Sequence, residues 1–202
     1  MSRWGIDVAG DQLSFADVFG AAGDVVLDIG FGGGEALIEV AELRPGEHVV
    51  GIDVHTPGAA AVLAAVDRRG LRNVRIVEGD AVDLITRVPL RSLAAIRVFF
   101  PDPWPKHRQR NRRLIRADVV DRLVPLLRPG GVLHLVTDTA DYAEQMRRVC
   151  DRPDLTGGEV ERPSWRPTTR YEQRAIDEGR VPVELVYTAS PSLPNASSSA
   201  PR

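Results

Sequence analysis

Short apolar runs alternate with amphipathic segments along most of this chain, and this alternation restricts the fold more than any other feature. Continuous apolar runs are typical of strands buried on both faces of a sheet, and the segments between them carry apolar residues at helical spacing. The predicted strands are Val25–Ile29, Val49–Val54, Val74–Val77, Ile96–Phe100 and Val132–Thr137, and the predicted helices are Glu35–Leu43, Ala59–Arg69, Ala81–Arg87, Arg112–Leu127 and Asp141–Val149. Such repeats in one direction predict an α/β fold with a doubly wound parallel sheet and helices on both faces.

The pattern weakens in the last part of the chain. Residues 151–163 are mixed and contain a Gly-Gly pair, whereas Arg170–Asp177 predicts a short helix and Pro182–Tyr187 a last strand. Ser, Pro and Ala dominate the end of the chain, as in disordered segments. We therefore expect an N-terminal lead-in (1–22), one domain (23–189) and a disordered tail (190–202).

Composition excludes several classes of protein. Of the 202 residues, 43% are hydrophobic and 27% are charged, which is ordinary for a globular domain. No apolar run reaches the ~18 residues of a transmembrane helix, and the first residues do not resemble a secretory signal. The single cysteine, Cys150, supports neither a disulfide framework nor a metal cluster, so we expect a buried thiol in a cytoplasmic protein without metal. Because the net charge is −2, a nucleic-acid site would need a local basic patch.

A glycine-rich loop follows the first predicted strand. Gly30 and Gly32 permit a tight turn and a close approach of the backbone to a ligand. Several nucleotide cofactors use such a loop, so the loop alone is a weak signal. The dinucleotide fingerprint would place its third glycine at Glu35, where a carboxylate would repel a pyrophosphate. Asp28 could instead pair with an ammonium group such as that of methionine.

Carboxylates also follow three consecutive predicted strands, as Asp28, Asp53 and Asp80. Ligands of doubly wound sheets bind at the carboxyl ends of the strands. Asp53 lies where a carboxylate accepts hydrogen bonds from a ribose diol, and Asp80 could accept from an adenine amino group. Helix capping is the alternative role for each of them. Their recurrence at consecutive strand ends favours a cofactor site.

The fourth predicted strand leads into Pro101–Lys106, a loop with three prolines. The prolines stiffen the backbone around Asp102 and Trp104. A fixed indole offers a stacking surface to a base outside its stack, and a carboxylate accepts from the N–H groups of that base. Packing of the loop is the alternative use of these residues. Their position at a strand end in the expected ligand cleft favours the binding role.

A run of cations follows this loop. It comprises Lys106, Arg108, Arg110, Arg112 and Arg113, and no acid appears before Asp118. A solvated helix face is the usual explanation of a charge run. Because this run adjoins the expected cleft, we expect it to bind RNA phosphates.

Six segments carry the distinctive residues of the chain in a fixed order: DIGFGGGE, GIDVH, EGDAV, FFPDPWPKHRQRNRR, LVTDTADYAE and RPTTRYEQRA. Together they resemble the bacterial tRNA (guanine-N7-)-methyltransferases, which modify the variable-loop guanine at position 46. The resemblance extends from about Gly23 to Tyr187. It implies a Rossmann-like class I fold with a mostly parallel seven-stranded sheet, S-adenosylmethionine as cofactor and tRNA as partner. It also implies a monomer or homodimer without an obligate protein partner.

The resemblance assigns roles residue by residue. Asp28, Gly30, Gly32, Asp53, Asp80 and Asp102 match the cofactor site, Asp102 is also the expected catalytic residue, Lys106, Asp138, Thr169, Arg170, Tyr171 and Glu172 match substrate contacts, and Arg108, Arg110, Arg112 and Arg113 match the RNA-contacting segment. Asp28 replaces a usual Glu, and His107, Gln109 and Asn111 weaken the basic patch. The family has a basic N-terminal arm before its first Trp, whereas this chain has three residues before Trp4, so reduced tRNA affinity or a trimmed start is expected.

The chemistry of the expected reaction requires orientation more than proton transfer. Guanine N7 has a lone pair and no proton, so an in-line displacement needs no base. Asp102 is expected to accept from guanine N–H groups or to offset the positive charge of the methylated ring. The alternatives are a class I methyltransferase of another RNA, a small molecule or a protein, and a non-catalytic RNA-binding relative. A nicotinamide dehydrogenase is disfavoured by Glu35 and by the lack of an acid for hydride transfer.

Overall fold

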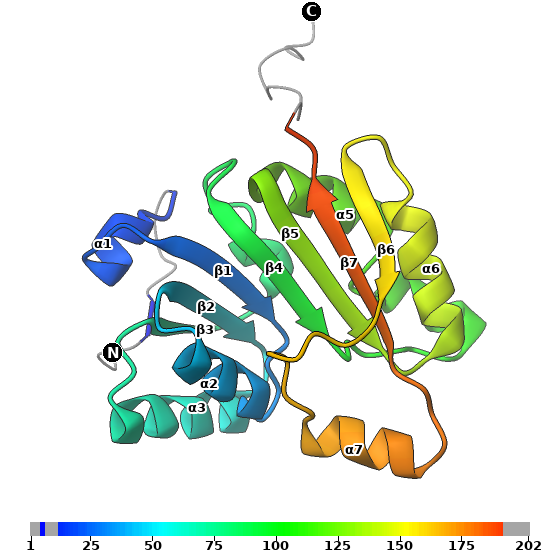
Figure 1. Cartoon of the computed structure of the whole chain (residues 1–202), viewed down its shortest axis with the longest axis horizontal. Coiled ribbons are helices and arrows are strands. Elements are labelled where there is room, and N and C mark those ends of the chain that lie inside the picture. Colours follow the sequence, from blue (N-terminus) through cyan, green and yellow to red (C-terminus); the bar gives the residue numbers. More distant parts are fainter. Residues whose placement is uncertain (1–4, 7–11, 192–202) are drawn as a thin grey trace, which may run out of the picture.

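A single seven-stranded sheet forms the centre of the protein in the computed structural model, which describes residues 5–6 and 12–191 (Figure 1). The strands are β1 (Asp24–Ile29), β2 (Glu47–Asp53), β3 (Val74–Glu78), β4 (Leu93–Phe99), β5 (Leu127–Thr137), β6 (Leu155–Val160) and β7 (Val183–Ala189). The helices are α1 (Phe15–Phe19), α2 (Glu35–Leu43), α3 (Thr56–Arg69), α4 (Ala81–Leu84), α5 (Ala117–Leu123), α6 (Ala140–Cys150) and α7 (Arg170–Asp177), with 3-10 helices η1 (His107–Arg112) and η2 (Val124–Leu126).

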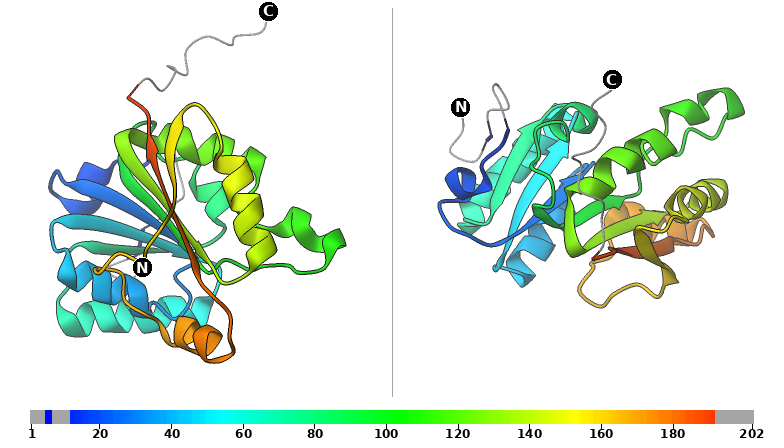
Figure 2. Two further views of the ribbon diagram at one scale, coloured as in Figure 1. Left: turned by 45° about the vertical axis from the view of Figure 1, so that its right-hand side comes forward. Right: turned by 90° about the horizontal axis from the view of Figure 1, so that it is seen from above.

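The strand order is β3-β2-β1-β4-β5-β7-β6, and β1 to β5 are parallel whereas β6 and β7 pair antiparallel. The chain moves outward from β1 to β3, then returns past β1 to β4 and moves the other way. Because such crossovers are right-handed, the helices of the two halves cover opposite faces of the sheet (Figure 2). A ligand crevice is expected where the order reverses, between the carboxyl ends of β1 and β4. This topology confirms the doubly wound, mostly parallel seven-stranded sheet.

The core follows from the continuous apolar runs. Within β1, Val25, Val26, Leu27 and Ile29 are each at most 4% exposed, as expected for a strand covered on both faces. Cys150 lies at the end of α6 with 1% exposure, and burial raises the pKa of its thiol to about 12. The expectation of a buried thiol is therefore confirmed.

One predicted helix is wrong. Residues 112–127 do not form a continuous helix: α5 covers only Ala117–Leu123, between η1 and η2. Pro125 lacks an N–H for an α-helical hydrogen bond, and the chain continues there as a 3-10 turn. The Pro129-Gly130-Gly131 segment, which follows the predicted helix and is typical of a helix end, lies inside β5.

The mixed segment after α6 contains β6, which the sequence pattern did not predict. Its Gly157 has φ 146°, and a Cβ there would lie 2.1 Å from the Val186 carbonyl oxygen of β7. Gly157, the first glycine of the pair that interrupts the apolar pattern, is thus what lets this edge strand approach its neighbour.

The expected lead-in contains α1, which begins at the N-cap Ser14 and ends at Gly20. The expected disordered tail, except for residues 190 and 191, lies outside the described residues, as does the start of the chain before Gly5. None of the helices described here has the length and hydropathy that crossing a membrane requires.

Candidate active site

The glycine loop joins β1 to α2 in left-handed conformations. Gly30 and Gly32 have φ values of 79° and 55°, and a Cβ at either position would meet only open space. At Gly34 a side chain is excluded by packing, because a Cβ at this position would lie 2.0 Å from Val62 Cγ2 of α3. Two glycines therefore shape the turn and keep its backbone accessible, and the third allows α3 to pack closely.

Asp53 and Asp80 both bond to backbone at strand ends. Asp53 accepts from Gly32 N at 2.7 Å and from His55 N at 2.8 Å, so it ties the glycine loop to the end of β2. Asp80 is the N-cap of α4 and accepts from Val82 N at 2.7 Å. The capping interpretation is thus confirmed for Asp80. Each carboxylate retains lone pairs that could accept from a ligand.

Asp28 differs from the other two acids because it is buried. Its exposure is 5%, and burial raises its carboxyl pKa to about 6, with the positive charge of Arg97 opposing this shift and the negative charge of Asp53 adding to it. Arg97 is the register partner of Asp28 on β4 and bonds to Glu47 at 2.6 Å. An ionised Asp28 would be stabilised by a cation that entered from the ligand side.

A cavity of about 280 Å³ lies above the carboxyl ends of β1 and β4. It is lined by Asp28, residues 30–37, Phe99, Phe100, Thr169 and Tyr171. The structure thus brings the predicted residues Asp28, Gly30, Gly32, Thr169 and Tyr171 together. Asp80, Asp102 and Lys106 do not line this cavity, and Asp53 reaches it only through its bond to Gly32.

The segment that carries Thr169 and Tyr171 reaches the cavity from the other end of the chain. Residues 161–169, here called the strap, connect β6 to α7, and Figure 1 shows α7 beyond the arrowheads of β1 and β4. Trp165 of the strap lies between Arg44 and Arg97, whose guanidinium carbons are 4.7 and 4.8 Å from its ring centre. This double cation–π contact holds the strap against β4.

A buried ion cluster lies beneath the strap. Arg166, 1% exposed, donates to both oxygens of Glu172 at 2.6 and 2.7 Å and to both oxygens of Glu184 at 2.8 and 2.9 Å. His134 contacts Glu184 at 2.5 Å, and burial lowers its pKa although Glu184 opposes this shift. The cluster therefore holds one guanidinium between two carboxylates, with the His134 ring against one of them.

The structure corrects the role predicted for Glu172. The residue was expected to contact substrate, but it is 2% exposed and both of its oxygens accept from Arg166. Its backbone N–H donates to Oγ1 of Thr169, the N-cap of α7, at 3.1 Å. The T-x-x-E spacing is a helix-start signal, and here Glu172 holds the helix to the core rather than reaching a ligand.

Three further predicted residues meet at the edge of the cavity. Asp138, 8% exposed, accepts from the Tyr171 hydroxyl at 3.3 Å and also pairs with Arg180. The Tyr171 ring lies 5.3 Å from that of Phe100. Arg170 is exposed and pairs with Glu35 of α2 at 2.9 Å. These contacts place the start of α7 against the glycine loop.

The loop after β4 has a strained backbone. Phe100 and Trp104 have φ values of 52° and 41°, which are unfavourable for side-chain-bearing residues and concentrate at functional sites. Asp102 and Lys106 are exposed on this loop. The Arg112 guanidinium lies 5.0 Å from the centre of the Trp104 ring.

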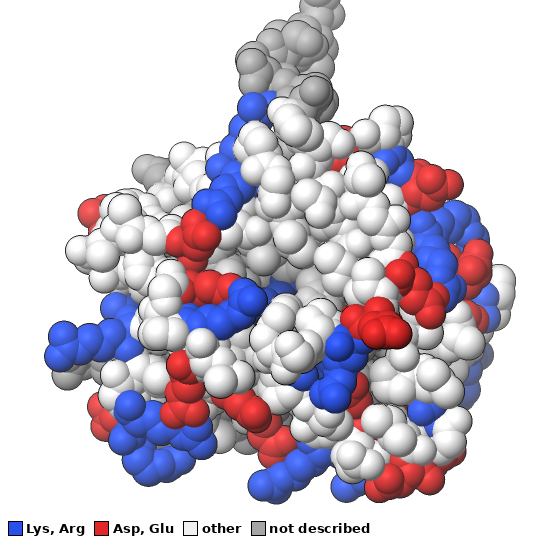
Figure 3. Space-filling view, viewed as in Figure 1, with Lys and Arg blue, Asp and Glu red and all other residues white. Residues whose placement is uncertain are grey.

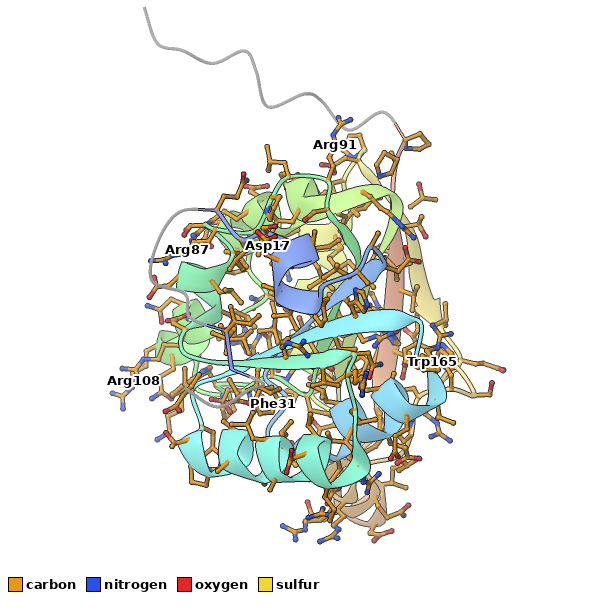
Figure 4. The ribbon with its side chains drawn as sticks, turned by 90° about the vertical axis from the view of Figure 1, so that its left-hand side faces the viewer. Asp17, Phe31, Arg87, Arg91, Arg108 and Trp165 are labelled. Atoms are coloured by element: carbon orange, nitrogen blue, oxygen red, sulfur yellow. The ribbon has the colours of Figure 1, made fainter. Side chains whose placement is uncertain are left out.

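The cationic segment divides into two parts. Arg108, Arg110 and Arg112 are exposed on η1, and Figure 4 shows Arg108 pointing away from the body of the protein. Arg113 is fully buried, so its assignment as an RNA contact is wrong. The face shown in Figure 3 carries basic and acidic side chains interspersed, without one continuous basic area.

Three charged residues of the site were missed by sequence analysis. Arg97, Arg166 and Glu184 are each at most 4% exposed. The sequence contained a signal for Arg97 and Glu184. Each is the single charged residue in an otherwise apolar strand segment, and such a pattern predicts a buried and paired charge. Arg166 lies in an irregular segment that gave no such signal.

The chain matches known proteins over most of its length. Residues 22–185 match the family model described as "Putative methyltransferase". A tRNA (guanine-N(7)-)-methyltransferase of Streptomyces avermitilis is 42% identical over 192 residues, covering 92% of this chain and 66% of the relative. The enzyme of the same name from Nitrosospira multiformis is 39% identical over 192 residues, covering 93% of this chain and 84% of the relative.

Solved structures share the fold at lower identity. TrmN from Thermus thermophilus has a TM-score of 0.59 and 21% sequence identity, covering 86% of this chain and 46% of that chain. This similarity shows that the two chains share a fold. Together with the family match and with the identity to the Nitrosospira enzyme over most of its length, these findings show that the chain belongs to the tRNA (guanine-N7-)-methyltransferase family.

Proposed function

We propose that this protein methylates N7 of a guanine in tRNA, at position 46 of the variable loop, with S-adenosylmethionine as methyl donor. The observation that carries the proposal is the shared cavity: Asp28, the glycine loop and the start of α7 line one space beside the loop that bears Asp102. The names of the two relatives support guanine N7 as the target atom. We expect the enzyme to act in the cytoplasm, as a monomer or homodimer.

The residues around the cavity suit S-adenosylmethionine. Asp28 provides a buried carboxylate for the ammonium of the methionine part, and the exposed backbone of Gly30 and Gly32 allows close approach. Asp53 has lone pairs left for a ribose diol, and Asp80 for an adenine amino group. When bound, this cofactor supplies a sulfonium-activated methyl group.

The protein's own contribution is orientation of the base. Guanine N7 needs no deprotonation, so the chain has to hold the lone pair in line with the methyl group and exclude water. Phe100 and Tyr171 provide aromatic surface in the cavity, and Trp104 lies on the loop that follows Phe100. Asp102 accepts from guanine N–H groups and offsets the charge of the methylated ring. Lys106, Arg108, Arg110 and Arg112, exposed beside this loop, contact RNA phosphates.

The test is transfer of a labelled methyl group from S-adenosylmethionine to unmodified tRNA. Asp102→Asn should lower kcat by roughly 100- to 1,000-fold while the cofactor Kd stays within about twofold, because the lost charge acts on the reacting base. A tRNA with adenine at position 46 should accept no methyl group. Transfer that persists on this tRNA would move the target to another nucleotide.

Two other functions make different predictions. A methyltransferase of another RNA or of a small molecule would turn over without tRNA or with a different RNA, and its rate on a small molecule would not depend on salt. A non-catalytic RNA-binding relative would bind tRNA equally well with and without S-adenosylmethionine and transfer no methyl group.

A further inference from the structure

Arg113 makes directed contacts from a fully buried position. Its Nε donates to the Pro103 carbonyl at 2.7 Å, one terminal nitrogen donates to Gln145 Oε1 at 2.9 Å, and the other donates to Asp141 Oδ2 at 2.7 Å. The guanidinium carbon lies 4.6 Å from the ring centre of Tyr142. The three nitrogens of the Arg113 guanidinium thus connect the loop after β4 to α6.

The contacted carbonyl is at the centre of the loop. Pro103 lies between Asp102 and Trp104, and the three prolines of Pro101–Lys106 have no N–H to fix the loop by other hydrogen bonds. Phe100 and Trp104 hold positive φ angles that are unfavourable for side-chain-bearing residues and persist only where surrounding contacts impose them. A donor at the Pro103 carbonyl is such a contact.

Helix α6 is also tied to the chain just after Arg113. The Tyr142 hydroxyl accepts from Ile115 N at 2.9 Å, and Gln145 Nε2 donates to the Ile115 carbonyl at 2.9 Å. Burial raises the pKa of Tyr142 to about 12, so the hydroxyl stays protonated at working pH. The backbone two residues after Arg113 is therefore held to α6, the same helix that the Arg113 guanidinium contacts.

We infer that Arg113 is a positioning residue for methyl transfer: through the Pro103 carbonyl it sets where Asp102 and Trp104 meet the target base. The inference rests on the proposed function. A lysine could supply the charge but not three hydrogen bonds in one plane. The role differs from phosphate binding, which requires only an accessible charge.

The test compares Arg113→Lys with the parent protein and with Arg148→Lys, a matched change at an exposed arginine of α6. Arg113→Lys should lower kcat by about 10- to 100-fold, because displacing a catalytic group by about 1 Å costs this much. The KM for tRNA, its salt dependence and the cofactor Kd should stay within about twofold of the parent values. Arg148→Lys should match the parent in every value.

Each outcome has a distinct meaning. If kcat is unchanged well below the melting temperature of Arg113→Lys, the residue has only a structural role and the inference is overturned. A change confined to the KM for tRNA and its salt dependence would assign Arg113 to RNA binding and also overturn it. If the parent itself transfers no methyl group to tRNA, the proposed function fails first.

A second variant covers the case in which Arg113→Lys does not fold. Gln145→Met removes one of the three partners and leaves Asp141 and Pro103 in place. It should lower kcat by about 3- to 10-fold without changing the KM for tRNA, since the guanidinium loses one of its constraints. An unchanged kcat in folded Gln145→Met would contradict the inference.

Discussion

Two irregular segments reach the active site from opposite sides, and each is held by one buried arginine. Arg113 holds the loop after β4, and Arg166 holds the strap. The charge partner of Arg113 is Asp141, whose side chain is 38% exposed and also pairs with Arg110, and its other partners are neutral. The partners of Arg166 are two carboxylates with exposures of 2% and 4%.

Because of this difference, we expect the Arg113 contacts to affect mainly activity and the Arg166 contacts to affect mainly stability. Asp141 keeps part of its hydration, so removing the Arg113 guanidinium leaves no isolated charge in the core. Removing Arg166 would leave Glu172 and Glu184 buried together without a counter-ion. We therefore expect the loop after β4 to change activity before stability, and the strap to change stability first.

The largest expected effect is a loss of stability when Arg166 is replaced, and it tests this difference between Arg113 and Arg166 directly. Arg166→Met should lower the free energy of unfolding by about 3–5 kcal/mol, because two buried carboxylates lose their only guanidinium partner among the described contacts. Urea denaturation gives this value, and Arg148→Met, at an exposed position, should stay within about 0.5 kcal/mol of the parent. A loss below about 1 kcal/mol for Arg166→Met would remove the distinction between the two segments.

The second-largest expected effect concerns Asp28 in the cofactor cavity. The strap is linked to this residue because Trp165 contacts Arg97, the neighbour of Asp28 on β4. Burial raises the pKa of Asp28 in the folded protein to about 6, above the ordinary carboxyl value of 3.8, so its ionisation opposes folding and stability from this group is lost as pH rises from about 4 to 6. Cofactor binding favours the ionised form, so affinity should rise about tenfold between pH 5 and 7.

Calorimetric titration with S-adenosylmethionine at several pH values measures this effect. Asp28→Asn should bind the cofactor weakly and with little pH dependence across the same range, since the titrating group is gone. The same rise of affinity in Asp28→Asn would assign the titration to another residue.

The smallest expected effect concerns Arg110, the exposed arginine that shares Asp141 with Arg113. Arg110→Met should change the free energy of unfolding by at most about 1 kcal/mol, because the ion pair is partly solvated. It should reduce the salt dependence of tRNA binding by about one unit of log–log slope, as for one lost phosphate contact. A loss of kcat like that of Arg113→Lys would show that both arginines position the loop.

Much of the fold could be predicted because its signals are local. The α2 boundaries Glu35–Leu43 agree with the structure, and the predicted parallel strands overlap β1 to β5. Apolar runs ended by glycine or proline report burial on both faces and the start of a turn within a few residues. The helix expected over residues 112–127 was wrong because its apolar residues belong to the irregular segment 113–116, to α5 and to η2, which pack on the same core.

The site could be predicted only in part. The positions of Asp28, Gly30 and Gly32 follow from the end of β1, and the cavity confirms that they lie together. The burial of Arg113 could not be read from a run of cations, because it depends on Asp141 and Gln145, about thirty residues later on α6.

The sequence by itself determined the doubly wound sheet, the glycine loop and the acids at the strand ends, because hydrophobic periodicity, glycine conformations and strand-end geometry act over short stretches of chain. Only the tertiary structure decided which charges bind a ligand and which hold the protein together. Arg113 pairs with Asp141 on α6, and Arg166, which holds Glu172, also pairs with Glu184 on β7. A buried charge is tolerated only beside its counter-ion, and that pairing exists only once the distant segments have packed.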